Sequence, residues 1–411
     1  MPSAHVSDRL DRYAELVVRV GLNVQPGQVV RVSADLSHAP VARAVVEHAY
    51  LAGASRVSVD YSDDLVRRST LQHAPMETLT SHEPWQLERL RGWERDGAAL
   101  LTLTGNPDPH VFDGIDGARL AAVPMELARE SRALTLGGGV SWCVVAAPNP
   151  GWATQVFGEP DEERLWEAVS IAMRLDEPDV VEAWREHRSR LQQRSAALER
   201  LDLDEVRYHG GATDLTVGII PGARWVSGSL KTLTGVEFMP NLPTEEVFTS
   251  PDRRRADGTI ALTRPLVMPA AGVLVEDLVV HFEAGRITDV SASTGEDAVR
   301  AELDTDSGAR SLGEVALVDG GSRVRAAGVV FHDTLYDENA GCHVAWGQSF
   351  PFALAGGLEL TGDELYERGL NTSNVHTDVV VGGPGVHVEG RTRDGRVVPI
   401  ITDDAWVLPV S

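Results

Sequence analysis

The sequence predicts a two-domain protein, with an N-terminal α/β domain built on a parallel sheet and a second domain built on a mixed or antiparallel sheet. The length of 411 residues exceeds what one hydrophobic core usually organises. The first half alternates helical and strand periodicities, whereas after residue 200 short strand-like runs are separated by Gly and Asp turns. We therefore expect domains over residues 1–200 and 201–411.

The first half begins with an amphipathic helix and continues as βαβ units. The apolar face of that helix comprises Leu10, Tyr13, Leu16, Val17 and Val20. Strands are expected at 28–33, 56–61, 98–104, 133–136 and 140–147, and helices at 37–51, 86–95 and 117–129. Strands that alternate with helices predict a parallel sheet covered by helices on both faces.

Residues 159–201 are expected to form two helices separated at Glu177-Pro178. The second helix carries one apolar stripe, formed by Val180, Trp184, His187, Leu191, Leu198 and Leu201. Beyond it, strands are expected at 214–219, 272–282, 286–292, 314–318, 379–381 and 386–389.

Charge and apolar patterning exclude several classes of partner. The chain has 37 Lys and Arg against 61 Asp and Glu, a net charge of −24. A surface this negative repels phosphate backbones and anionic lipid, so neither nucleic acid nor membrane is an expected partner. No apolar run is long enough for a transmembrane helix, and the N-terminus lacks the apolar segment of a signal peptide. The only two cysteines, Cys143 and Cys342, are expected to be buried thiols of a cytoplasmic protein.

Carboxylate and imidazole side chains are concentrated in the second half. The stretch from Asp333 to Phe350 contains Asp337, Glu338 and His343. Such groups are the ligands that divalent first-row metals prefer. The motifs H-E-x-x-H and G-x-S-x-G are absent, so neither a zincin nor a serine hydrolase is indicated.

Three further segments contribute acids and a histidine in informative contexts. Glu314 begins an otherwise apolar strand, where a carboxylate is costly unless it is paired or metal-bound. His376 and Asp378 are two residues apart on a strand, so both side chains point to the same face. Glu245 and Glu246 are adjacent on an extended segment, so they should point in opposite directions and do different work. Each residue taken singly has an ordinary structural explanation, and the hypothesis of a metal site depends on their occurring together.

Four segments resemble the signature blocks of the aminopeptidase T / aminopeptidase S family of dimetal aminopeptidases. They are NLPTEEVFTSPD, LGEVALVD, LYDENAGCHVAWG and NTSNVHTDVVVG, and the resemblance extends over the whole chain. It implies a cytoplasmic, homodimeric exopeptidase that removes the N-terminal residue of peptides with a free N-terminus. It also implies two divalent ions, zinc, cobalt or manganese, in the C-terminal domain. The ligand positions of the family fall on Glu246 (favoured over Glu245), Glu314, Glu338, His343, His376 and Asp378.

The chain departs from the family at one catalytic position. Where the family carries a tyrosine after the ligand histidine, this chain has Phe350. If that hydroxyl stabilises the oxyanion of the tetrahedral intermediate, its loss costs about 10²–10³ in turnover. Tyr336, two residues before Glu338, is a candidate substitute.

Three functional hypotheses follow. The first is peptide hydrolysis by a water bound to two metals, with the non-ligating member of the Glu245–Glu246 pair as general base. The second keeps the architecture but holds a single iron, as in ring-cleaving dioxygenases, and the number of carboxylates argues against it. The third is a weakly active or non-catalytic binding homologue, motivated by Phe350.

Overall fold

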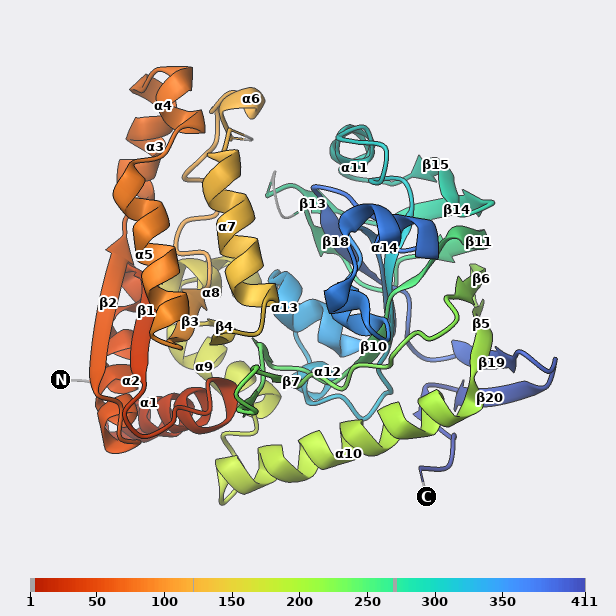
Figure 1. Ribbon diagram of the computed structural model, residues 1–411, viewed down its shortest axis with the longest axis horizontal. Coiled ribbons are helices and arrows are strands. Elements are labelled where there is room, and N and C mark those ends of the chain that lie inside the picture. The colour runs from red at the N-terminus through yellow and green to blue at the C-terminus, as the bar shows by residue number, and fades with distance from the viewer. Residues whose placement is uncertain (1–3, 121, 269–271, 411) are drawn as a thin grey trace. The chain divides into compact units, whose positions relative to one another are not determined.

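The structure is a computed structural model that describes residues 4–120, 122–268 and 272–410. The chain forms two compact units (Figure 1). The first comprises Met1–Arg185 and Ser229–Pro243, and the second comprises Glu186–Gly228 and Thr244–Ser411. The chain passes from the first unit to the second within helix α10, Val180–Leu201. The mixed α/β fold class is confirmed, while the domain division near residue 200 stays a prediction.

The first unit is built on a five-stranded parallel sheet with strand order β2-β1-β3-β4-β9. Its strands are β1 Val29–Asp35, β2 Arg56–Ser62, β3 Ala99–Thr104, β4 Ser141–Ala146 and β9 Asn241–Leu242, with the small pair β7 Leu230–Lys231 and β8 Glu237–Phe238 beside them in sequence. Its helices are α1 Ala4–Leu16, η1 Val17–Gly21, η2 Leu36–His38, α2 Ala39–Leu51, α3 Asp64–His73, α4 Met76–Thr80, α5 Pro84–Arg95, α6 Gly117–Leu120, α7 Met125–Leu136, α8 Pro150–Phe157 and α9 Glu162–Ala172.

Helices cover both faces of this sheet because its strands are apolar on both sides. On one face, Leu100 and Trp142 pack with Leu90 of α5 and Leu134 of α7. Residues that alternate with them, such as Leu101 at 1% exposure, are buried on the other face, where α2 packs against β1 and β2. The predicted parallel sheet between two helical layers is therefore confirmed.

Three predicted elements were wrong in detail. The helix expected over 117–129 is interrupted, and Pro124 is the N-cap residue of α7. The strand expected at 133–136 is the last turn of α7, since a four-residue apolar run fits a buried helix as well as a strand. The strand expected at 272–282 is divided into β13 and β14 at Asp277, which has a φ of 52°.

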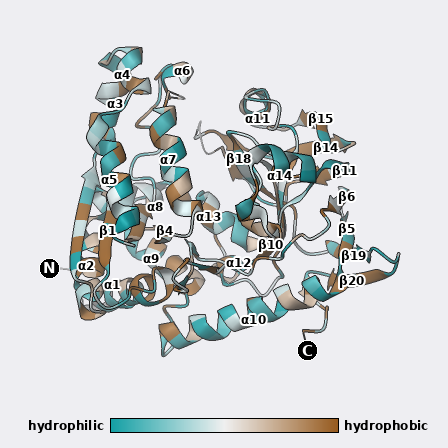
Figure 2. Ribbon diagram, viewed as in Figure 1, coloured by the Kyte–Doolittle hydropathy of each residue, from teal (hydrophilic) through white to brown (hydrophobic). Residues whose placement is uncertain are grey.

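Helix α10 confirms the predicted apolar stripe. Figure 2 shows hydrophilic and hydrophobic residues alternating along it. Leu191 and Leu198 of the stripe are fully buried in the core of the second unit. Cys143 and Cys342 are both buried and free, as expected.

Two larger antiparallel sheets of the second unit share one hydrophobic core, and a two-stranded sheet formed by 266–267 and 274–275 adds to it. The larger has the order β15-β14-β11-β6-β5-β19-β20-β21, and the smaller has the order β10-β16-β17-β18. Tyr208 and Val217 of the larger sheet and Val344 of the smaller sheet are fully buried in that core. The strands are β5 Leu203–Gly210, β6 Thr213–Ile219, β10 Val247–Thr249, β11 Pro251–Ala261, β12 Leu266–Val267, β13 Leu274–Val275, β14 Val279–Glu283, β15 Arg286–Ser291, β16 Leu312–Leu317, β17 His343–Gly347, β18 His376–Val380, β19 His387–Thr392, β20 Val397–Thr402 and β21 Ala405–Trp406.

Short helices connect these strands. They are α11 Glu296–Leu303, α12 Arg323–Ala326, α13 Thr334–Asp337, η3 Glu338–Ala340, η4 Pro351–Ala353, η5 Gly357–Glu359 and α14 Gly362–Arg368. No helix in the described part of the chain combines the length and apolar character needed to cross a bilayer.

Truncation of the buried sheet residue Leu101 to alanine should destabilise the first unit by about 2–5 kcal/mol, because it removes apolar contacts and leaves a cavity. The matched control is Leu51→Ala, at a leucine that is 76% exposed, where a change of at most about 0.5 kcal/mol is expected. Scanning calorimetry of both variants checks the difference. Equal unfolding temperatures for the two variants would contradict the packing described above.

Candidate metal centre

The small sheet of the second unit places four of the six predicted ligands on one face. Residues paired across neighbouring strands project to the same side of a sheet. Glu314 of β16 pairs with Ala345 of β17, which in turn pairs with Asp378 of β18. His376 pairs with Gly347, and His343 pairs with Ala316. The alternation predicted for His376 and Asp378 thus puts both on the same face as Glu314 and His343.

The residues between the ligands are small, and the opposite face is apolar. Ala316, Ala345 and Gly347 separate the charged side chains on the ligand face, which leaves space above the backbone. Gly347 has a φ of 97°, and a Cβ there would lie 2.1 Å from the carbonyl oxygen of Val375. The opposite face contributes Val315, Leu317, Val344, Trp346 and Val379 to the core. Packing on that side fixes the strand register, and the register brings the ligands together.

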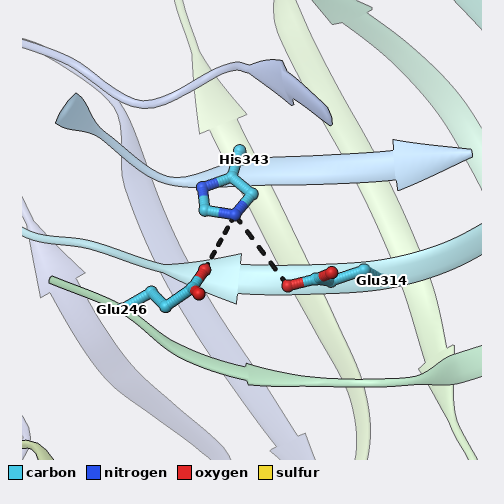
Figure 3. A group of neighbouring side chains, drawn as sticks. All are labelled: Glu246, Glu314 and His343. Atoms are coloured by element: carbon cyan, nitrogen blue, oxygen red, sulfur yellow. Dashed lines mark ion pairs between the residues drawn. The ribbon is translucent and has the colours of Figure 1, made fainter. Parts of the chain in front are cut away.

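The side chains form two overlapping groups. Glu246 Oε2 lies 2.9 Å from His343 Nε2, and Glu314 Oε1 lies 3.9 Å from the same nitrogen (Figure 3). His376 Nε2 lies 3.3 Å from Glu314 Oε2 and 3.6 Å from Asp378 Oδ2. In each group the candidate ligand atoms all lie within 4.8 Å of one another. Glu314 belongs to both groups.

Backbone carbonyls orient both imidazoles. His343 Nδ1 donates to the carbonyl of Gly341 at 3.2 Å, and His376 Nδ1 donates to that of Gln348 at 2.8 Å. A carbonyl oxygen only accepts, so each Nδ1 carries the hydrogen and each Nε2 faces the carboxylates. Metal-ligating histidines are held in this way in metalloproteins.

The pKa values of Glu314, Glu338, His343 and His376 are raised, by burial in the two glutamates and by neighbouring carboxylates in the two histidines. Burial raises the pKa of Glu314 to about 7, and the charges of Glu246 and Asp378 add to the effect. Burial, with the charges of Asp378, Glu246 and Glu314, raises the pKa of Glu338 well above its usual value. Burial lowers the pKa of His343, but its hydrogen bond to Glu246 and the surrounding carboxylates raise it overall to about 10. Burial lowers the pKa of His376, but the charge of Asp378 and the hydrogen bond and charge of Glu314 raise it overall to about 9.

The donor set fits divalent cations. Glu246, Glu314 and Asp378 are buried, and the ion pairs that they make are with the two histidines. Three buried carboxylates with two imidazoles leave excess negative charge, which an interior tolerates only when protons or cations neutralise it. Oxygen and imidazole ligands suit zinc, cobalt or manganese.

The adjacent glutamates Glu245 and Glu246 contact different partners, as their alternation predicted. Glu245 is 3% exposed and lies away from the histidines of the cluster. Its Oε1 accepts a hydrogen bond from the Arg323 amide at 3.1 Å, and its Oε2 lies 3.4 Å from His187 Nε2. The sequence did not predict the contact with His187, because a histidine within the apolar stripe of a helix is expected to be a packing residue.

The remaining candidates flank the cluster. Glu338 and Asp378 line a hollow of about 20 Å³ together with Asp333, Asp337 and Arg264. Glu338 does not belong to either of the two groups whose ligand atoms lie within 4.8 Å of one another. Asp337 accepts a hydrogen bond from the Phe331 amide at 2.9 Å and lies 3.8 Å from Arg264.

The two aromatic candidates differ in surroundings. Tyr336 is 0% exposed, and its ring packs on that of Phe331 with 4.6 Å between centroids. Phe350 is half-buried, and its ring centroid lies 5.1 Å from that of His376. Phe350 therefore borders the cluster, whereas Tyr336 is enclosed by packing.

Known proteins resemble the chain over nearly its whole length. Residues 6–406 match the family model described as thermophilic metalloprotease (M29). Aminopeptidase T of Thermus aquaticus is 39% identical over 410 residues, covering 98% of this chain and 99% of the relative. Aminopeptidase 2 of Geobacillus stearothermophilus is 36% identical over 409 residues, covering 98% of each chain. The solved structure of wild-type AmpT from Thermus thermophilus superposes with a TM-score of 0.89 at 37% identity, covering 98% of this chain and 99% of that one. The chain belongs to the M29 family of thermophilic metalloproteases, as a metallo-aminopeptidase.

Proposed function

We propose that this enzyme removes the N-terminal residue of peptides by means of two divalent ions, zinc, cobalt or manganese. Glu246, Glu314, Glu338, His343, His376 and Asp378 would hold them. The observation that carries the proposal is that Glu314 belongs to both ligand groups. Glu246 and His343 would hold one ion and His376 and Asp378 the other, and the two carboxylate oxygens of Glu314 would serve both.

Two ions in such a site supply a water of lowered pKa and polarise the scissile carbonyl. The residues of the chain do the rest. The carbonyls of Gly341 and Gln348 keep the two imidazoles oriented, which preserves the site through a turnover. The net charge of −24 favours a substrate that brings a positive α-amino group.

The non-ligating glutamate of the pair, in this scheme, is Glu245. Its carboxylate interacts with His187 and the Arg323 amide. Its own amide donates to Asn339 Oδ1 at 2.7 Å, next to Glu338. These contacts support a positioning role for Glu245, which would tie the segment before β10 to the segment that carries Glu338. The general-base role that the sequence suggested for this glutamate stays a prediction.

The cellular setting remains part of the proposal. Two buried, free cysteines are compatible with a reducing compartment, so we propose a cytoplasmic enzyme. A homodimer that binds neither nucleic acid nor membrane is the assembly that we infer for it.

Metal loading should take up two ions per chain and release protons at pH 7. In the metal-free protein Glu314, Glu338, His343 and His376 all have raised pKa values, so they retain protons that ligation must displace. Affinity should therefore rise with pH from about pH 7, near the pKa of Glu314, to about pH 10, near that of His343. Calorimetric titration with Zn²⁺ or Mn²⁺ in two buffers of different ionisation enthalpy measures the number of ions bound per chain and the number of protons released. One ion per chain would favour the single-iron alternative.

The same shifts predict how the stability of the metal-free protein changes with pH. A group with a higher pKa in the folded than in the unfolded state binds more protons when folded, so the free energy of unfolding falls as pH rises. For Glu314 the fall lies between about pH 4.5 and 7, and for His343 it lies between about pH 6.5 and 10. Urea unfolding at several pH values, with chelator present, checks the sign. A stability that rises over these ranges would contradict it.

Replacing Glu314 with glutamine should reduce turnover to background while the fold is kept, because the shared ligand loses its charge and half of its acceptor capacity. The matched control is Glu359→Gln, at an exposed glutamate in the same unit, which should keep full activity. Hydrolysis of aminoacyl chromogenic substrates, circular dichroism and metal content are measured on both. Full turnover by Glu314→Gln would refute the assignment.

Restoring a hydroxyl at residue 350 should increase turnover. The ring of Phe350 already borders His376, so Phe350→Tyr would add an oxyanion donor worth up to about 10²–10³ in kcat. Phe352→Tyr adds the same hydroxyl to the neighbouring ring and serves as the control. Steady-state kinetics on one alanyl substrate compares the two variants. An unchanged kcat in Phe350→Tyr would mean that the chain stabilises its oxyanion by other groups.

A further inference from the structure

The parallel sheet of the first unit has a hollow on the face that packs against α5 and α7. Figure 1 shows these two helices side by side next to the strands. The hollow measures about 400 Å³, and every residue that lines it belongs to the first unit. Ser33 of β1 and Thr102 of β3 line it and pair with each other across two interior strands. We call this space the sheet hollow.

Strand β1 is an exception to the apolar character of the sheet on this side. Arg31, Ser33 and Asp35 alternate along it, so their side chains lie on the face of the hollow. Ser33 and Thr102 are exposed, although both lie on interior strands of a sheet with helices on both faces. Strands that are covered on both faces are normally apolar throughout. The helices therefore leave this part of the sheet open, and its polar residues are not part of the hydrophobic core.

The hollow lies where the order of the strands reverses. From β1 the chain continues to β2 on one side, and it then returns to β3 on the other side of β1. In open α/β sheets the connections diverge at such a point, and small molecules bind in the resulting crevice near the carboxyl ends of the strands. A volume of about 400 Å³ is within the range of small-molecule sites. Position and size thus both suit a ligand.

Arg31 has a hydrogen-bond donor left for an anion. Its Nη1 donates to Ser58 Oγ at 2.8 Å, whereas its Nε is buried and has no acceptor among the described residues. The other arginine that lines the hollow, Arg89, is already paired with Asp60, at 3.2 Å between Nη1 and Oδ2. A buried guanidinium donor without an acceptor is costly, and a carboxylate that binds to it removes that cost.

Two tryptophans, Trp93 of α5 and Trp142 of β4, contribute aromatic surface to the hollow. The indole N–H of Trp142 donates to the carbonyl of Thr135 at 3.0 Å, so this ring offers a ligand its apolar surface and not its donor. The guanidinium of Arg89 lies 4.9 Å from the centroid of the Trp93 ring. Indole rings next to arginine suit a flat aromatic ring that carries a negative charge.

A nucleotide suits the hollow less well than a carboxylate does. Phosphate binding at this place in an α/β sheet uses a glycine-rich turn after the first strand and the N-terminus of the next helix. Here the turn after β1 is Asp35-Leu36-Ser37-His38, which has no glycine. The side chain of Asp35 accepts a hydrogen bond from the Ser37 amide at 2.8 Å. A carboxylate already uses this amide, and its charge repels phosphate.

We propose that the sheet hollow binds a small aromatic carboxylate, with Arg31 holding the carboxylate and Trp93 and Trp142 contacting the ring. The residues of the hollow and those of the metal centre belong to different units, so this is a second site. The proposal does not depend on the peptidase reaction. Free aromatic amino acids and aromatic acids without an amino group share this chemistry.

Calorimetric titration of the metal-loaded enzyme with indole-3-acetate, tryptophan and tryptamine tests the proposal. Indole-3-acetate should bind with a Kd below about 1 mM, and tryptamine, which lacks the carboxylate, should bind at least about tenfold more weakly. Tryptophan that binds as tightly as indole-3-acetate supports the site with free amino acids as its ligands, and weaker binding of tryptophan supports it with acids that lack the amino group. Tryptamine binding as tightly as indole-3-acetate, or no heat of binding with either carboxylate, would overturn the proposal.

Variants locate the binding place. Arg31→Gln should weaken the binding of indole-3-acetate at least about tenfold, because the carboxylate loses its charged donor. The matched control Arg56→Gln changes an exposed arginine at the start of the neighbouring β2, outside the lining of the hollow, and should keep the wild-type Kd.

Two further variants keep Arg31. Ser33→Leu fills the hollow and should abolish binding while the unfolding temperature is kept, and Glu314→Gln alters only the metal centre and should bind as the wild type does. Wild-type affinity in Arg31→Gln or in Ser33→Leu would show that the ligand binds elsewhere and overturn the proposal. Loss of binding in Glu314→Gln would place the ligand at the metal centre and overturn it as well.

Discussion

Mutual repulsion among buried carboxylates is the constraint on which the second unit depends. Glu314 and Asp378 share one face of a short sheet with two imidazoles, and Glu246 reaches the same cluster from the residue before β10. Removing such groups from water costs several kcal/mol each unless opposite charge is supplied. In the protein alone, protons supply it, which is why the pKa values of Glu314 and Glu338 are raised. Divalent ions replace those protons, so the same crowding that opposes folding without metal provides affinity for metal.

The sheet tolerates this crowding because its two faces are chemically separate. The charged residues of β16, β17 and β18 alternate with Val315, Val344 and Val379, which are fully buried in the core. A slip of one residue in register would bury the carboxylates in that core and expose the valines. The apolar face therefore stabilises one register strongly, and the ligand geometry follows from that register without further specification. Gly347 adds to this, since its positive φ and its close approach to Val375 exclude a side chain at the edge of the site.

Local sequence patterns predicted those features of the site that depend only on residues close together in the chain. Alternation put His376 and Asp378 on one face, and an isolated Glu314 in an apolar strand marked a charged group that needed a partner. Sequence patterns failed where tertiary contacts decide: residues 133–136 are helical because Leu134 packs on the parallel sheet. The contact of His187 with Glu245 joins residues far apart in the chain, and no periodicity signals it. The same holds for Phe248, whose position beside Phe350 follows only from the pairing of β10 with β16.

Phenylalanine at residue 350 changes the polarity of the surface beside His376. A tyrosine here would direct a hydroxyl toward the polar centre and require a partner for it, whereas phenylalanine extends an apolar surface up to His376. The loss of one donor weakens stabilisation of developing charge, but it also removes a polar group from the surface formed with Phe248 and Phe352. Losing one oxyanion donor costs about 2.7–4 kcal/mol, whereas burying an aromatic side chain gains about 1.5–3 kcal/mol, so packing at residue 350 does not fully offset the lost hydroxyl.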